Sequence, residues 1–142
     1  MGGILTRSLG LDIGDRRIGV ALSDALGILA SPFNIIECKG EEEDIEAIIA
    51  IVDQHQVKQI IAGLPRSMDG RLGAQAKKVE AFVQKLRNRT EVPVDFRDER
   101  LTTVSAKRLM QDAKTKKTRI KARDDAVAAA IILQSYLDET QL

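Results

Sequence analysis

The chain is poor in the residues on which several common kinds of protein site depend. Its 142 residues include one cysteine, Cys38, and one histidine, His55. An internal disulfide needs two cysteines and a multi-histidine zinc site needs several histidines, so both are excluded within one chain. Aromatic residues make up only 3% and tryptophan is absent, which argues against extensive stacking on nucleic-acid bases. Any bound nucleic acid would be held mainly by its backbone.

Long apolar runs and nucleotide-binding loops are also missing. No run approaches the roughly 20 residues of a membrane-spanning helix, and the start, MGGILTRSLG, has too short an apolar stretch for a signal peptide. With the lone cysteine, these features predict a cytoplasmic protein without a membrane partner. No GxxxxGK[ST] loop is present, which disfavours P-loop nucleotide binding. The length predicts a single domain over residues 1–142.

Charge is nearly balanced overall, at +1, but it is unevenly distributed. Bases gather in KTKKTRIKAR, from Lys114 to Arg123, directly before Asp124 and Asp125. Such a run is typical of a solvated loop, and it also suits contact with phosphates. Three residues of the run are candidate contacts to a nucleic-acid backbone: Lys116, Lys117 and Arg119.

The spacing of apolar residues predicts an α/β fold. Strands are expected over Ser8–Ile13, Arg17–Ser23, the end of Ile28–Cys38 after a loop through Pro32, Lys58–Leu64 and Val92–Phe96. Helices are expected over Glu41–His55, Ala74–Arg89, Thr102–Ala113 and Asp124–Asp138. Meandering strands followed by alternating helices and strands indicate a mixed sheet with helices on its faces. The first, fourth and fifth strands should be parallel neighbours.

Three carboxylates stand at the ends of apolar segments. Asp12 ends one in LGLDIG, Glu99 ends another in VPVDFRDER, and Asp125 opens DDAVAAAIILQSYL. Acids in such positions are costly unless something offsets their desolvation, and hard divalent cations with oxygen ligands do so. Ligands bind beyond the carboxyl ends of parallel strands, where Asp12 and Glu99 are expected, and Asp125 joins them if the last helix crosses that edge. The pattern predicts a site for Mg²⁺ or Mn²⁺; the alternative is that these acids cap helices or form ion pairs.

Four segments carry a family resemblance. GLDIGDRRIGVALSD, GLPRSMDG, DERLTT and DDAVAAAIILQSYL resemble, in order, the motifs of the YqgF/RuvX family, and they span Gly10–Leu137. The resemblance implies a ribonuclease H-like fold, here a five-stranded mixed sheet with helices on both faces, and metal-dependent cleavage of phosphodiester bonds. Family members are regarded as nucleases that mature the 5′ end of 16S ribosomal RNA precursors, and the older name rests on similarity to Holliday junction resolvases.

The resemblance also implies roles for individual residues. The family's catalytic, metal-binding acids fall on Asp12, Glu99 and Asp125, since Asp125 rather than Asp124 stands immediately before AVAAAIIL. The chain departs from the family pattern at Arg66-Ser67, which puts substrate contacts in doubt, and at Asp124, which doubles an acid.

The chemistry of phosphodiester hydrolysis fits these positions. Two divalent ions would activate a water and stabilise the charge at phosphorus, with Asp12 bridging them and Glu99 and Asp125 each holding one. Arg16 and Arg100 lie beside the motifs and can offer forked donors to phosphate, while alternation is expected to send Arg17 elsewhere. Ordinary surface ion pairs are the alternative for these arginines. Ser23 and Asp24 are expected near the same edge, as positioning residues or as turn residues.

Several functions are compatible with these features. A nuclease acting on pre-16S ribosomal RNA is the first, with a Holliday junction resolvase on branched DNA as its alternative. A non-catalytic RNA-binding factor for ribosome assembly would be favoured by loss of an acid, but all three are present. An actin-like phosphotransferase would need a second lobe, for which 142 residues are too few. The sequence leaves open RNA or DNA as the substrate, and a monomer or homodimer as the assembly.

Overall fold

The computed structural model describes residues 6–65, 73–99 and 121–140. In chain order, the elements of these residues are β1 (Ser8–Ile13), β2 (Arg17–Ser23), β3 (Ala30–Glu37), α1 (Glu41–Gln54), β4 (Gln59–Leu64), α2 (Ala74–Arg87), β5 (Val94–Asp98) and α4 (Lys121–Thr140). The predicted helix Thr102–Ala113 lies outside them. Among the helices within this part of the chain, none is long and apolar enough to cross a membrane.

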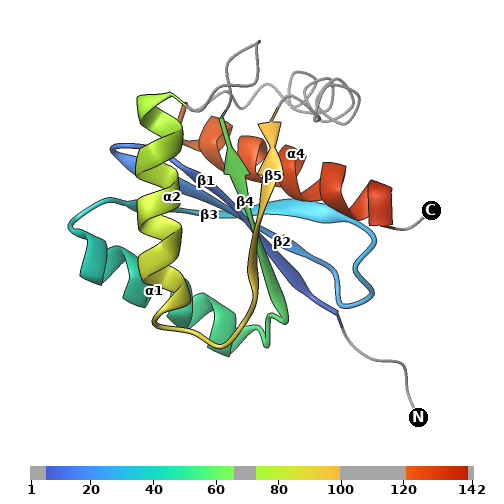
Figure 1. Ribbon diagram of the computed structural model, residues 1–142. Coiled ribbons are helices and arrows are strands. Elements are labelled where there is room, and N and C mark those ends of the chain that lie inside the picture. The colour runs from blue at the N-terminus through green and yellow to red at the C-terminus, as the bar shows by residue number, and fades with distance from the viewer. Residues whose placement is uncertain (1–5, 66–72, 100–120, 141–142) are drawn as a thin grey trace.

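The strands form one mixed sheet in the order β3-β2-β1-β4-β5 (Figure 1). The meander β1-β2-β3 is antiparallel, whereas β1 pairs with β4 and β4 with β5 in parallel. Parallel neighbours need a crossover connection, and α2 supplies it between β4 and β5. The predicted five-stranded mixed sheet, with β1, β4 and β5 as parallel neighbours, is confirmed.

One face of the sheet is covered by α1 and α2, and it holds the larger core (Figure 1). Alternate residues of each strand point toward these helices, so the core receives Leu9 and Leu11 from β1 and Ile60 from β4. From the helices come residues spaced three or four apart, as expected for amphipathic helices: Ile45, Ile48, Val52, Val79, Val83 and Leu86.

The other face is covered by α4, which lies very close to the strands. A Cβ atom added at Gly10 of β1 would lie 2.8 Å from the Ala129 carbonyl oxygen and 2.8 Å from the Leu133 Cβ atom. Ala129 and Ala130 are fully buried there. Small residues on both partners allow this short distance between helix and sheet.

Polar contacts anchor the C-terminal half of α4. The Gln134 amide nitrogen donates to the Ile28 carbonyl at 3.0 Å, and its amide oxygen accepts from the Ala30 N–H at 2.8 Å, so it holds the start of β3. On β5, the buried Arg97 donates through Nη2 to Ser135 Oγ at 2.9 Å and to Glu139 at 2.8 Å. These contacts fix the helix across the sheet.

Several element boundaries differ from those predicted. β3 runs through Pro32, which was expected in a loop; Pro32 pairs with Ala21 in an edge strand beside a register shift, where proline costs little. β5 begins at Val94 rather than Val92, and α4 begins at Lys121 rather than Asp124.

Candidate active site

Asp12 stands on β1, one residue before the strand ends, and lies on the α4 face with Gly10. Its register partner on the neighbouring strand is Gly19 of β2. Burial, and after it the negative charge of Asp125, raise the pKa of Asp12 from its ordinary value of 3.8 to about 6. The Asp12 carboxylate therefore lies in an environment that disfavours its charged form.

Asp125 reaches Asp12 because α4 rests directly on β2. A Cβ atom added at Gly19 would lie 1.9 Å from the Asp125 carbonyl oxygen and 2.3 Å from its carbonyl carbon. No side chain fits in this space, so glycine at this position brings the first described turn of α4 against the register partner of Asp12. The contact explains why two acids 113 residues apart in sequence influence each other.

Glu99 approaches from the other side of Asp12. It directly follows β5, and its Oε2 atom lies 3.0 Å from the position that a Cβ atom of Gly63, on β4, would occupy. Burial, the charge of Asp12 and the charge of Asp98, in that order, raise the pKa of Glu99. Asp12 is therefore the central acid, because the charge of Asp125 raises its pKa and its own charge raises the pKa of Glu99.

The donor set is made of carboxylate oxygens that repel one another, which is the chemistry that suits a hard divalent cation. A cation would remove the cost expressed in the raised pKa values of Asp12 and Glu99. Nevertheless, no three Asp, Glu, His or Cys side chains of the described residues are arranged as a metal site as they stand. The predicted ligand set fits the ion by its chemistry, and metal binding stays a prediction.

A family model and several relatives match the chain over most of its length. The family model described as "RuvX: Holliday junction resolvase" matches residues 6–139. The chain belongs to the RuvX family. A relative from Halothermothrix orenii, named as a candidate pre-16S rRNA nuclease, is 46% identical over 93% of this chain and 94% of its own. Another with the same name, from Clostridium kluyveri, is 47% identical over 93% of this chain and 96% of its own.

Solved structures confirm the ribonuclease H-like fold of this RuvX protein. The chain aligns with Thermus thermophilus RuvC in complex with a Holliday junction substrate at a TM-score of 0.62 and 11% identity, over 95% of this chain and 96% of RuvC. It aligns with the fowlpox virus resolvase, bound to Holliday junction DNA, at a TM-score of 0.57 and 11% identity, over 96% and 100% of the two chains. At these identities the likeness concerns the fold alone.

Of the two neighbouring arginines, Arg17 lies elsewhere than expected, and the phosphate contact of Arg16 stays a prediction. Arg16, a predicted phosphate contact, is exposed in the turn between β1 and β2. Arg17, expected elsewhere, contacts the site: its Nη1 lies 3.8 Å from Asp125 Oδ2, and its Nε lies 3.3 Å from Glu37. Alternation along β2 places Arg17 on the same face as Gly19, a signal that was available in the sequence. The other predicted contacts, Arg100, Lys116, Lys117 and Arg119, lie outside the described residues, as do Arg66-Ser67 and the side chain of Asp124.

Ser23 and Asp24 do not lie at the acidic edge, so that expectation is wrong. β2 runs antiparallel to β1, and its end therefore lies beside Ser8, at the start of β1. There Ser23 Oγ accepts the Ser8 N–H at 2.8 Å, and one Asp24 carboxylate oxygen accepts the N–H groups of Ile28 and Leu29 at 2.7 and 3.1 Å. The alternative role as a turn residue is confirmed for Asp24, whereas Ser23 is the last residue of β2 and holds the start of the first strand.

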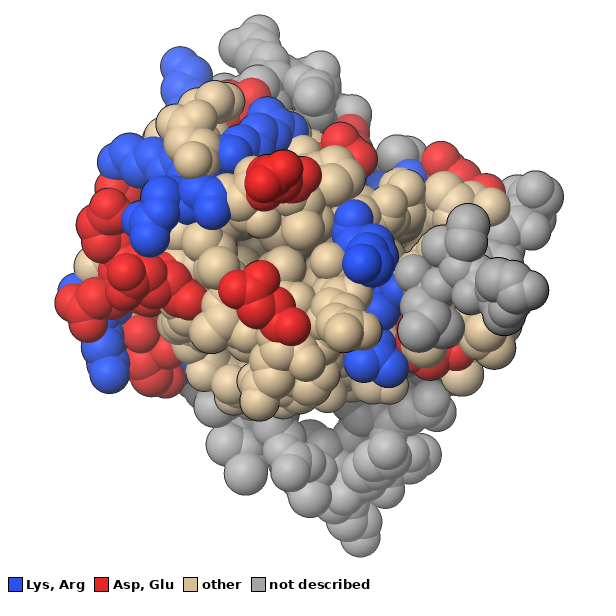
Figure 2. Space-filling view, turned by 90° about the horizontal axis from the view of Figure 1, so that it is seen from below, with Lys and Arg blue, Asp and Glu red and all other residues tan. Residues whose placement is uncertain are grey.

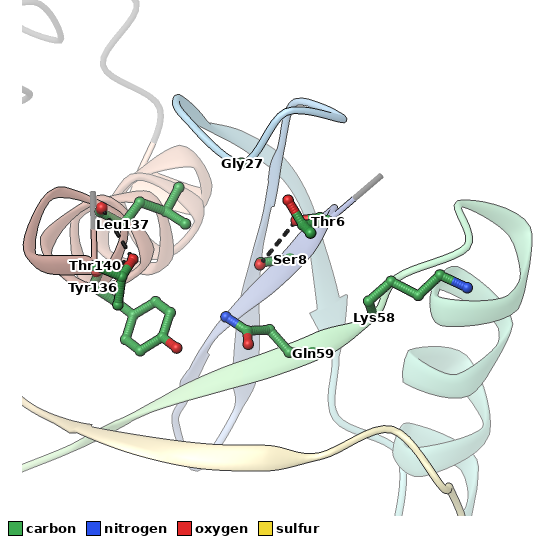
Figure 3. Close-up of a pocket in the computed structure, with 8 residues that line it drawn as sticks. All are labelled: Thr6, Ser8, Gly27, Lys58, Gln59, Tyr136, Leu137 and Thr140. Carbon is green, nitrogen blue, oxygen red and sulfur yellow. Dashed lines mark hydrogen bonds between the residues drawn. The ribbon is translucent and has the colours of Figure 1, made fainter. Parts of the chain in front are cut away.

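A pocket of about 220 Å³ opens at this opposite end of the sheet (Figure 3). Residues before or at the starts of β1 and β4, including Ser8 and Gln59, line it together with Tyr136 of α4, and no acidic residue takes part. Figure 2 views the molecule from this side and shows Lys, Arg, Asp and Glu mixed, with uncharged residues between them. The described residues at the end of the molecule opposite the acids thus show no uniform charge that would attract a phosphate backbone.

Proposed function

We propose that this RuvX-family chain is a metal-dependent nuclease that hydrolyses phosphodiester bonds, with the 5′ end of a pre-16S ribosomal RNA as its substrate. The observation that carries the proposal is the placement of Asp12, Glu99 and Asp125. They come from β1, the end of β5 and α4, and at the carboxyl edge of the sheet Asp12 interacts electrostatically with each of the other two. A substrate of this kind places the protein in the cytoplasm.

The relatives support the choice of RNA. Proteins 44–47% identical to this chain, over 93% of its length, are named as candidate pre-16S rRNA nucleases. The description of the family model instead names a Holliday junction resolvase, so branched DNA is the competing substrate. A resolvase cuts two symmetric strands and would work as a homodimer, whereas a nuclease that trims one RNA end can work as a monomer.

Mg²⁺ or Mn²⁺ would be held by the three carboxylates, with Asp12 at the centre because it interacts electrostatically with Asp125 and with Glu99. When bound, such ions activate a water molecule and stabilise the charge that develops at phosphorus. The chain itself contributes the orientation of the ligands. Gly19 places Asp125, and Arg17 contacts the Asp125 carboxylate from β2.

Positive side chains would hold the substrate backbone. Arg16 lies in the turn that follows β1, at the edge where Asp12 is found. Arg100 follows Glu99 directly, and Lys116, Lys117 and Arg119 precede α4 in sequence. All five are proposed phosphate contacts, because cations next to carboxylates that bind metal can pair with the phosphates that approach those metals.

The proposal is tested with purified protein on end-labelled pre-16S RNA fragments and on a four-way DNA junction, in Mg²⁺, Mn²⁺ or EDTA. We expect metal-dependent cleavage of the RNA, and loss of cleavage in Asp12→Asn. Cleavage of the junction alone would establish the resolvase. Binding of RNA without cleavage in either metal would establish the non-catalytic assembly factor.

The basic segment has its own test. Each phosphate contact on a single strand contributes about 0.7 to the slope of log affinity against log salt concentration. Replacing Lys116, Lys117 and Arg119 with alanine should flatten that slope and weaken RNA and DNA binding alike, while Mn²⁺ affinity changes little. Weakening for one sequence only would show that the segment recognises bases.

A further inference from the structure

The backbone conformation at Gly63 does not require a glycine. It stands in β4, one residue before the strand ends. Among the described residues, positive φ angles at glycine occur at Gly27 and Gly40, and Gly63 has none. In a strand interior, glycine is destabilising relative to alanine. A glycine in an extended strand often marks close approach of another group, so the space above Gly63 is the feature to explain.

Two side chains fill that space. A Cβ atom at Gly63 would lie 2.5 Å from the Ile132 Cδ1 atom and 3.0 Å from Glu99 Oε2. Ile132 belongs to α4, and Glu99 follows β5, the strand that pairs with β4 through Gly63 and Arg97. The Glu99 carboxylate thus rests on the bare backbone of β4, below α4 and on the side of the sheet where Asp12 lies.

The three glycines under α4 differ in what a side chain would displace. At Gly19 the obstacle is the backbone of Asp125, and at Gly10 it includes the carbonyl oxygen of Ala129. These atoms are fixed in a helix. At Gly63 both obstacles are the ends of flexible side chains, so a methyl group could be accommodated if Ile132 and Glu99 moved. A substitution at Gly63 should therefore disturb the acid more than the fold.

We propose that Gly63 is a positioning residue. Because it has no side chain, the Glu99 carboxylate can lie against the backbone of β4 and point toward Asp12. The inference rests on the proposed function, because the position of Glu99 affects catalysis only if Glu99 is a metal ligand. A methyl group at Gly63 would displace the Glu99 carboxylate from this position. Residues that orient a metal ligand typically change metal affinity about 10- to 100-fold when they are replaced.

The first test measures steric contact without metal. Thermal unfolding in EDTA is compared for wild type, Gly63→Ala, Glu99→Ala and the double variant. If the methyl group crowds Glu99, removal of Glu99 relieves the crowding, and the melting temperature of the double variant lies above the value expected from adding the single effects. Additive effects would overturn the inference.

The second test measures Mn²⁺ binding by calorimetry for the same four proteins. Gly63→Ala should weaken binding about 10- to 100-fold in the wild-type background and have no further effect in Glu99→Ala. An equal loss in both backgrounds would mean that Gly63 does not act through Glu99, and would overturn the inference.

A matched variant separates Glu99 from α4. Ile132→Val removes the Cδ1 atom nearest to the added methyl group. If the loss of Mn²⁺ affinity in Gly63→Ala arises from Glu99, it persists in Gly63→Ala/Ile132→Val; if adding Ile132→Val restores it, the helix was the cause and the inference is wrong. Non-additive unfolding in EDTA, with no Mn²⁺ binding by wild type, would support the contact between Gly63 and Glu99 while contradicting the proposed nuclease.

Discussion

The two faces of the sheet are formed by alternating residues of the same strands, yet they are packed differently. Toward α1 and α2, the strands present large aliphatic side chains such as Leu9, Leu11 and Ile60, which are fully buried. Toward α4, β1, β2 and β4 present Gly10, Gly19 and Gly63, and the helix lies close to the strand backbone. The first face buries much apolar area, while the second gives up side-chain volume for a short distance between helix and sheet.

The difference assigns separate tasks to the two faces. Burial of large side chains stabilises the fold by about 25 cal/mol per Å² of apolar surface. On the face toward α4, the close approach of helix and sheet brings Asp125 and Glu99 to Asp12, although grouping acids in this way costs free energy. Stability and the candidate site should therefore be separable by mutation, even at adjacent residues of β1.

The largest expected effect is the loss of cleavage in Asp12→Asn, on the face toward α4. Loss of the central carboxylate should lower the cleavage rate at least about 1,000-fold, equivalent to about 4 kcal/mol of transition-state stabilisation. Stability in EDTA should stay unchanged or rise, because the substitution removes a buried charge near Asp125. Single-turnover cleavage and urea unfolding measure the two quantities. A large loss of stability would mean that Asp12 has a structural role.

Leu11→Ala, one residue earlier and on the face toward α1 and α2, should have the opposite effect: it should lower stability and leave cleavage nearly unchanged. Leu11 is fully buried against the helices of that face. Its truncation should lower the free energy of unfolding by about 3 kcal/mol. Cleavage per folded molecule should be nearly unchanged at a temperature where the variant remains folded. If activity fell as much as in Asp12→Asn, the two faces would not be separable.

The pH dependence of stability sharpens the same comparison. With a pKa of 3.8 when unfolded and about 6 when folded, Asp12 loses its proton earlier in the unfolded chain. Metal-free protein should therefore lose stability as the pH rises from about 4 to 6, by about 2–3 kcal/mol. Urea unfolding in EDTA across this range tests it.

Two controls accompany this pH measurement. Asp12→Asn should flatten most of the slope, leaving the part that comes from the raised pKa of Glu99. Leu11→Ala should keep the wild-type slope at lower overall stability, because it leaves every carboxylate in place. A slope that is the same in wild type and Asp12→Asn would contradict the raised pKa of Asp12.

The smallest expected effect distinguishes two neighbouring arginines. Arg17 pairs with Asp125 and Glu37, and its side chain is 41% exposed, so Arg17→Ala should cost about 0.2–1 kcal/mol in metal-free protein. Arg16→Ala, in the exposed turn, should leave stability unchanged. Unfolding in EDTA at low and high salt compares them, and an equal effect would show that the contact of Arg17 with Asp125 contributes nothing.

Much of the fold followed from local patterns in the sequence. Alternating or continuous apolar residues predicted β1, β2 and β4 within one residue of their bounds, because side-chain periodicity depends on neighbours in the chain. The predicted start of β3 was wrong because of Pro32. Proline usually ends a strand but is tolerated in an edge strand, and whether a strand lies at an edge depends on the whole sheet. The pairing of β1 with β2 likewise moved Ser23 and Asp24 away from the acids.

The types of the described elements, the family and the three candidate acids followed from the sequence, because each depends on contiguous residues or on motifs in a fixed order. Tertiary packing set how these acids meet: Asp125 lies beside Asp12 because Gly19 admits the backbone of α4, and the Glu99 carboxylate lies against Gly63. It also placed Arg17, rather than Arg16, against Asp125. Such contacts depend on register and on the distance between helix and sheet, which are set by the packing of segments far apart in the chain.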